Sequence, residues 1–113
     1  MDRLTKYQSI IENYLQEVAD FYCPKDSPTI FDILSSYRNR HFQLVEFGHT
    51  TEEWRFTVIM HFHVEASGKI VLLANNTEQE PFGELIEAGI EEEDLYVGWV
   101  PPIIQAQLEK QPA

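Results

Sequence analysis

The amino-acid sequence predicts an α+β fold in which an N-terminal helix packs on a mainly antiparallel sheet of about five strands, with a short second helix before the last strand. Apolar residues first recur at helical spacing and then, after Pro28, at the spacing of two that strands require. The expected strands are joined by short turns, and this grouping favours antiparallel pairing. The chain has 113 residues, which suits a single domain, and we place that domain at residues 1–113.

The first helix is expected between the start of the chain and Pro24. Its apolar side chains recur in steps of three and four and therefore share one stripe, made of Leu4, Tyr7, Ile11, Tyr14, Val18 and Phe21. Pro24 ends the helix because the residue before a proline resists helical geometry. The stripe predicts a surface that packs on the sheet, and the alternative is a heptad seam between two subunits.

Four strands are expected in the middle of the chain, at 29–35, 41–47, 53–64 and 69–74. In the longest of them the even-numbered residues are apolar and the odd-numbered residues are mostly polar, so the even face is expected in the core. Trp54 and Trp99 are accordingly expected in the core, and either one would be an interface anchor if it lay outside. Gly68 can adopt the left-handed conformation of a hairpin turn at 65–68.

The last third of the chain predicts a short helix and one further strand. Thr77 is the candidate N-cap, Glu80 is expected in the first helical turn, and Gly89 is the stop signal. The final strand is expected at 95–100. Residues 103–110 have room for one or two more helical turns.

The net charge of −11 bears on the class of partner. DNA binding requires cations that neutralise phosphates, and the only close basic pair is Arg38 with Arg40. Direct nucleic acid binding is therefore not expected, unless Arg38, Arg40 and Arg55 gather on one face. An acidic surface suits a protein partner with a basic face. A lone sheet also leaves edges that pair readily, which favours a homodimer.

Cellular location follows from cysteine usage and hydropathy. The single cysteine, Cys23, cannot form an internal disulfide, which fits a reducing compartment, and we expect it to be a small apolar residue at the helix end. No apolar stretch approaches the roughly 20 residues that span a bilayer, and no secretion signal is apparent. We expect a cytoplasmic protein that does not enter membranes.

His61 and His63 are the sharpest candidates for site chemistry. Residues two apart on a strand point the same way, so both imidazoles could reach one metal ion, with His41 and His49 as further ligands. Arg55 is expected on the same face, and its positive charge opposes the binding of a metal cation there. The competing interpretation is a polar strand face without a metal. A small enzyme or ligand-binding protein would require a pocket lined by His61, His63 and Arg55.

Acidic residues are dense at Glu91, Glu92, Glu93 and Asp94. A catalytic carboxylate pair needs two unlike environments, whereas four consecutive acids favour a solvated turn. The functional alternative is a docking patch for a basic partner. No nucleophile with its base and no phosphate-binding loop stands out, so no catalytic residue and no cofactor is predicted. Arg55, His61, His63 and the four acids are the candidate partner-binding residues.

Several short segments, in this order and at this spacing, resemble the XisI family. They are the run 41–48, then Gly68-Lys69-Ile70, then Asn76-Thr77-Glu78, then the runs 84–90 and 94–98. The XisI family consists of small cyanobacterial proteins named for a controlling factor needed to excise the fdxN DNA element. This chain resembles a divergent member, because Val71 stands where the family usually carries a tryptophan.

The resemblance implies a function as well as a fold. The family's named role is accessory, alongside a recombinase and a companion called XisH. The expected function is therefore that of a non-catalytic regulatory factor, which controls DNA-element excision by binding an XisH-like protein. The alternative is a small metal-binding or ligand-binding protein that uses the His61/His63 strand face.

Overall fold

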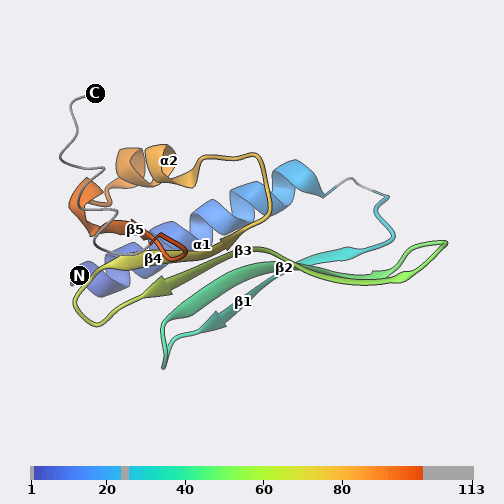
Figure 1. The fold of residues 1–113 in the computed structure, drawn as a ribbon, viewed down its shortest axis with the longest axis horizontal. Coiled ribbons are helices and arrows are strands. Elements are labelled where there is room, and N and C mark those ends of the chain that lie inside the picture. The colour runs from blue at the N-terminus through green and yellow to red at the C-terminus, as the bar shows by residue number, and fades with distance from the viewer. Residues whose placement is uncertain (1, 24–25, 101–113) are drawn as a thin grey trace.

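The computed structural model describes residues 2–23 and 26–100, and in it helices cover one face of a five-stranded sheet (Figure 1). The strand order is β1-β2-β3-β4-β5, and the sheet is antiparallel except for the parallel pair β4 and β5. This confirms the predicted α+β arrangement. The elements are α1 (Arg3–Tyr22), β1 (Ile30–Ser36), β2 (His41–His49), β3 (Trp54–Val64), β4 (Ile70–Asn75), α2 (Pro81–Ala88), a 3-10 turn (Glu92–Asp94) and β5 (Leu95–Val97).

Helix α1 begins at a side-chain cap, because the Asp2 carboxylate accepts a hydrogen bond of 2.8 Å from the Thr5 backbone N–H. It ends at Tyr22, as Pro24 predicts. The buried stripe differs from the prediction at its last member, because Phe21 is 74% exposed and Ala19 is buried instead. An α-helix has 3.6 residues per turn, so a stripe with a period of 3.5 drifts away from the core along the helix.

The core lies between α1 and the sheet face that α1 covers. The strands contribute large side chains that are fully or almost fully buried, namely Phe42, Leu44, Met60, Phe62, Val64, Ile70 and Leu72. Leu85 from α2 closes the core on the side of β4 and β5. Burial of each large side chain stabilises the fold by about 1.5–3 kcal/mol. None of the helices among the described residues combines the length and the apolar character needed to cross a membrane.

The alternation of β3 is interrupted by a β-bulge. Leu44 of β2 pairs with Met60, but the next residue, Val45, pairs with Val58. Ile59 is therefore an extra residue on β3. An extra residue shifts the side-chain alternation by one position, so the even-numbered side chains change faces at the bulge.

The bulge overturns the prediction for the first half of β3. Phe62 lies beyond the bulge and is buried, whereas Trp54 is 58% exposed and Phe56 is 60% exposed. Their side chains lie on the face that the helices do not cover. The tip of the β2–β3 hairpin also reaches past the end of α1 (Figure 1).

Helix α2 begins later than the sequence predicts. Its first residue is Pro81, and Glu80 is the N-cap and makes no side-chain capping bond. The reason is that a residue before proline resists helical geometry, while proline itself fits the first helical position. Thr77 is therefore not the cap. Its hydroxyl accepts a hydrogen bond from the Gln79 N–H within the preceding turn.

The chain after α2 follows the prediction only in part. Gly89 ends the helix with φ at 120°, as expected of a glycine stop. Strand β5 is shorter than predicted, at Leu95–Val97. Trp99 lies outside it and is 60% exposed, so the prediction that it is a core residue is wrong. The helical turns predicted at 103–110 lie outside the described residues.

Candidate protein-interaction surfaces

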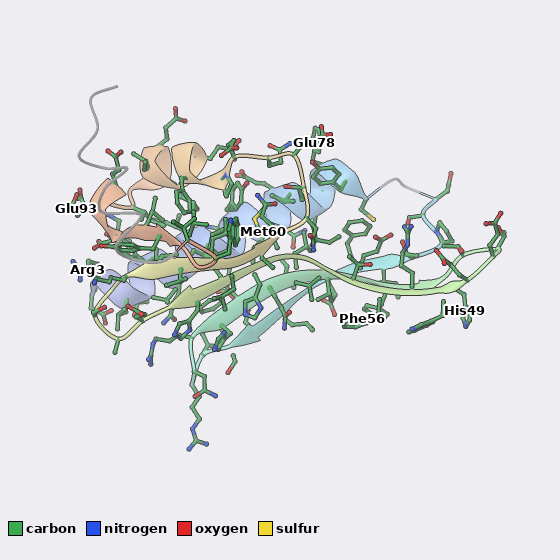
Figure 2. The ribbon with its side chains drawn as sticks, viewed as in Figure 1. Arg3, His49, Phe56, Met60, Glu78 and Glu93 are labelled. Carbon is green, nitrogen blue, oxygen red and sulfur yellow. The ribbon has the colours of Figure 1, made fainter. Side chains whose placement is uncertain are left out.

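The sheet face that turns away from α1 and α2, called the open face from here on, is the first candidate surface. The strand registers place on it Ile30, Asp32, Leu34 and Ser36 of β1, His41, Gln43, Val45, Phe47 and His49 of β2, Trp54, Phe56, Val58, His61 and His63 of β3, and Val71 and Ala74 of β4. Figure 2 shows the side chains of Phe56 and His49 pointing away from the helices. Asp32 is the only carboxylate in this set.

Aromatic rings gather at the end of the open face near the hairpin tip. The rings of Phe47 and Phe56 lie 6.5 Å apart, and those of His49 and Trp54 lie 5.1 Å apart, measured between centroids. Ile30 of β1, paired with Phe47, is also exposed. Exposed aromatic clusters are typical of protein contacts, because Trp and other large rings dominate binding energy once they are covered. The sequence alone places Trp54 and Phe56 in the core, because local alternation carries no signal of the bulge.

The other end of the open face carries a cluster of three histidines. His41 Nδ1 lies 3.0 Å from His61 Nε2, and the His41 ring stacks on the His63 ring with centroids 4.3 Å apart. His63 Nδ1 lies 3.2 Å from the Arg40 carbonyl oxygen. The prediction that His61 and His63 share a face is therefore confirmed, and the register of β2 with β3 brings His41 to them.

The environment of the histidine cluster favours uncharged imidazoles. Burial lowers the pKa of His41, and the neighbouring charges of His63 and Arg40 lower it further. Burial also lowers the pKa of His61, with His41 and His63 contributing. His49 lies beside Trp54 at the far end of β2 and does not join the cluster. Among residues 2–23 and 26–100, no group of three or more His, Cys, Asp or Glu side chains is arranged to hold a metal ion.

Arg55 does not lie with His61 and His63. It pairs with Gly48, on the opposite sheet face, and its guanidinium lies 3.4 Å from the Glu46 carboxylate. The same carboxylate accepts a hydrogen bond of 2.7 Å from the Thr29 hydroxyl. The bulge is again the cause, because Arg55 and His61 stand on either side of Ile59. A pocket lined by Arg55 and both histidines is therefore excluded.

The acidic run divides into exposed and buried members. Glu91, Glu92 and Glu93 are exposed, whereas Asp94 is buried. The Asp94 carboxylate accepts a hydrogen bond of 2.7 Å from the Tyr7 hydroxyl and lies 3.7 Å from the Arg3 guanidinium. Asp94 is therefore a structural residue, and the solvated patch consists of the three glutamates.

Carboxylates are concentrated on the helix side of the molecule. Helix α1 carries Glu12, Glu17 and Asp20, helix α2 carries Glu84 and Glu87, and Glu78, Glu80 and the three exposed glutamates lie in the adjoining loops. Figure 2 shows Glu78 and Glu93 on this side. The two sides of the described fold therefore differ in charge: the helix side is acidic, and the open face is aromatic and nearly free of carboxylates.

The basic residues proposed as a DNA-contacting set are separated. Arg38 and Arg40 lie at or beside the β1–β2 turn, whereas Arg55 pairs with Gly48 near the other end of β2. Gly48 lies seven positions from His41 along β2, which corresponds to about 23 Å. The condition that these three arginines gather on one face is therefore not met.

Comparisons with known proteins agree on one family. A family model described as XisI protein matches residues 1–109. The chain is similar to the crystal structure of a XisI-like protein from Anabaena variabilis ATCC 29413, with 26% sequence identity and a TM-score of 0.78 over 88% of this chain and 90% of that chain. It is also similar in fold to the fdxN element excision controlling factor XisI from the same organism, with 18% identity and a TM-score of 0.75 over 92% of this chain and 99% of that chain. A comparison with curated proteins gives no match.

Proposed function

Because this chain belongs to the XisI family, we propose that it is a non-catalytic regulatory factor that controls excision of a DNA element by binding proteins. One proposed partner is an XisH-like protein, and the other is a second copy of the chain. A solved structure of similar fold is named as an excision controlling factor, which supports the choice of process. We assign the cutting of DNA and the contacts with DNA to other proteins. This is in keeping with the net charge of −11 and the separated arginines of this chain.

The observation that carries this proposal is the difference in charge between the two sides of the fold. An exposed aromatic surface that is nearly free of carboxylates is stabilised when another apolar surface covers it. A surface of exposed carboxylates attracts a basic partner instead. The two sides therefore suit two different contacts.

The open face is the proposed homodimer contact. Two copies of an acidic chain repel each other through most of their surfaces, but the open face carries Asp32 as its only carboxylate. Face-to-face association would cover Trp54 and Phe56 and keep the acidic helices of both copies outward. The uncharged state favoured at His41 and His61 is compatible with such a contact at neutral pH.

The helix side is the proposed contact for the XisH-like partner. Its carboxylates are solvent-exposed, so attraction to a basic surface acts through water and is screened by salt. Raising the ionic strength is expected to weaken the complex with the partner. The homodimer depends on apolar contact and is expected to resist the same change.

Size-exclusion chromatography with light scattering tests both contacts. The chain alone is expected to elute as a homodimer, and the variant Phe56→Glu is expected to elute as a monomer. Thr51→Glu is the matched control, because it adds the same charge at an exposed position near the hairpin tip. Co-expression with an XisH-like protein is expected to give a joint peak. Separate peaks at low salt would contradict the proposed partner.

A further inference from the structure

A groove between α1 and α2 on the acidic helix side is a second candidate site. It consists of two adjoining hollows of about 270 Å³ and about 260 Å³. Tyr14, Glu17 and Glu84 line both hollows, so they mark the middle of the groove. Glu17 stands on α1 and Glu84 on α2, which places one carboxylate on each wall.

Tyr14 forms the floor of the groove. Its side chain is only 5% exposed, and its ring packs edge-on against Phe62 of the core with centroids 6.4 Å apart. Every fully buried polar side-chain atom of the described residues has a hydrogen-bond partner. The Tyr14 hydroxyl has none among residues 2–23 and 26–100, so it must reach the surface of the groove that Tyr14 lines. A buried ring thus presents an unpartnered oxygen to the groove.

The electrostatic state of the groove is negative. Burial raises the pKa of Tyr14 to about 12, and the negative charges of Glu84 and Glu17 contribute, so the hydroxyl stays protonated at neutral pH. Within the described part of the chain, the salt bridges are Arg3 with Asp94 and Arg55 with Glu46. Neither Glu17 nor Glu84 is therefore paired with a cation there.

The middle of the groove offers three oxygen-bearing side chains, those of Tyr14, Glu17 and Glu84, beside apolar walls. Val18 lies in one hollow and Ala88 in the other. A lysine ammonium is complementary to these groups, because it has three N–H donors and no acceptor. Its four methylenes can lie along apolar side chains while the charged end meets the oxygens. An arginine presents a flat fork of five donors, which suits a single planar carboxylate better than a hydroxyl and carboxylates drawn from two helices.

We infer that the α1–α2 groove receives a lysine side chain of the basic protein partner, with its ammonium donating to the Tyr14 hydroxyl oxygen and to the Glu17 and Glu84 carboxylates. This inference rests on the proposed function, because the lysine belongs to the XisH-like partner. Phe21 lines the same groove and is largely exposed, so it provides an apolar contact beside the lysine. The contact lies on the opposite side of the molecule from the open face.

Calorimetric titration of the intact chain with the XisH-like protein tests the groove. Glu17→Gln and Glu84→Gln are each expected to raise the dissociation constant at least tenfold. Tyr14→Phe keeps the buried ring, removes the hydroxyl, and is expected to raise the constant several-fold. Glu87→Gln is the matched control, because it removes the same charge from α2 at an exposed position outside the groove, and it is expected to change the constant less than twofold. If Glu17→Gln, Glu84→Gln and Glu87→Gln all raised the dissociation constant equally, the groove would be overturned as the lysine site. Only general electrostatic attraction would then remain.

A second measurement distinguishes failure of the groove from failure of the proposed function. The chain alone is titrated with N-acetyl-lysine amide, and nuclear magnetic resonance follows the Tyr14 ring and the Glu84 backbone amide. Selective shifts that N-acetyl-glutamine amide does not produce are the expected result. If these shifts occur but no complex with the XisH-like protein forms, the groove stands and the proposed partner is wrong. If neither Tyr14 nor Glu84 responds, the groove is overturned whatever the partner does.

Discussion

The Tyr7 hydroxyl donates a hydrogen bond of 2.7 Å to the buried Asp94 carboxylate, although 87 positions separate the two residues in the chain. The same hydroxyl accepts a hydrogen bond of 3.2 Å from the Glu91 backbone N–H. Burial is the main reason that the pKa of Tyr7 is raised, so the hydroxyl remains a donor at neutral pH. These two hydrogen bonds connect the first half of α1 to the turn that leads into β5.

Removing the Tyr7 hydroxyl is expected to destabilise the fold. Tyr7→Phe keeps the buried ring but leaves a buried carboxylate without its donor, and we expect the free energy of unfolding to fall by about 1–3 kcal/mol. Urea unfolding followed by circular dichroism measures the change. Glu92→Gln, at an exposed position in the same turn, is expected to stay within about 0.5 kcal/mol. If Tyr7→Phe lowered the free energy of unfolding no more than Glu92→Gln does, the Tyr7–Asp94 hydrogen bond would contribute nothing to stability.

Two glycines are expected to respond in opposite directions to alanine. Gly68 has φ at +97° in the β3–β4 turn, and a Cβ there would meet the Arg3 guanidinium that donates to the Ser67 carbonyl. Gly68→Ala is expected to lower stability by about 1–3 kcal/mol. Gly83 lies in α2 with no atom near its missing Cβ, so Gly83→Ala is expected to raise stability by about 0.5–1 kcal/mol. Thermal unfolding of the two variants provides the comparison, and a stabilised Gly68→Ala would contradict it.

The histidine cluster predicts a pH dependence of stability. The pKa values of His41 and His61 are lowered in the folded chain from an unfolded value near 6.5, so the unfolded chain binds protons first as the pH falls. The contribution of both residues is therefore complete above about pH 6.5 and is lost below it, as the pH passes through the folded pKa values.

Urea unfolding between about pH 7 and pH 5 measures this dependence, because most carboxylates have not yet titrated in that interval. The loss of stability on acidification is expected to be smaller in the double variant His41→Gln/His61→Gln than in the unmodified chain. His49→Gln is the control, because His49 lies outside the cluster. If stability fell equally steeply with pH in the double variant and in the unmodified chain, the histidine cluster would not be the source of the pH dependence.

The bulge at Ile59 predicts unequal roles for two phenylalanines of β3. Phe62→Ala is expected to cost about 3–5 kcal/mol, because it empties a fully buried position. Phe56→Ala at an exposed position is expected to cost less than about 1 kcal/mol when the protein is diluted to a monomer. Chemical unfolding at high dilution measures both. Similar large losses would mean that β3 has unbroken alternation and that Phe56 is a core residue.

Local patterns account for most of the elements. The stripe of α1, the hairpin turn at Gly68 and the helix stop at Gly89 are each predicted from residues close together in the chain, and all three are present. The errors in α2 and β5 concern only boundaries. At Pro81 the missed signal was already in the sequence, because a proline permits a helix to begin at its own position and opposes helical geometry just before it.

The candidate surfaces could be predicted only in part. His61 and His63 share a face because they lie two apart within an unbroken stretch of strand, so period-two reasoning succeeds there. Asp94 could not be separated from Glu93 by the sequence, because its burial depends on Tyr7 and Arg3 of a distant helix. Tyr14 belongs to the predicted helix stripe, but the second wall of the groove comes from α2, which is distant in sequence.

The sequence by itself determined the family, the order of the elements and the acidic character of the chain, since these depend on residue identity and short-range spacing. Only the tertiary structure decided which side chains meet water. The extra residue at Ile59 becomes a bulge through the pairing of β3 with β2, and that pairing turns Trp54 and Phe56 outward. Strand pairing joins residues that are far apart in sequence, so the energy that selects its register is absent from any local segment.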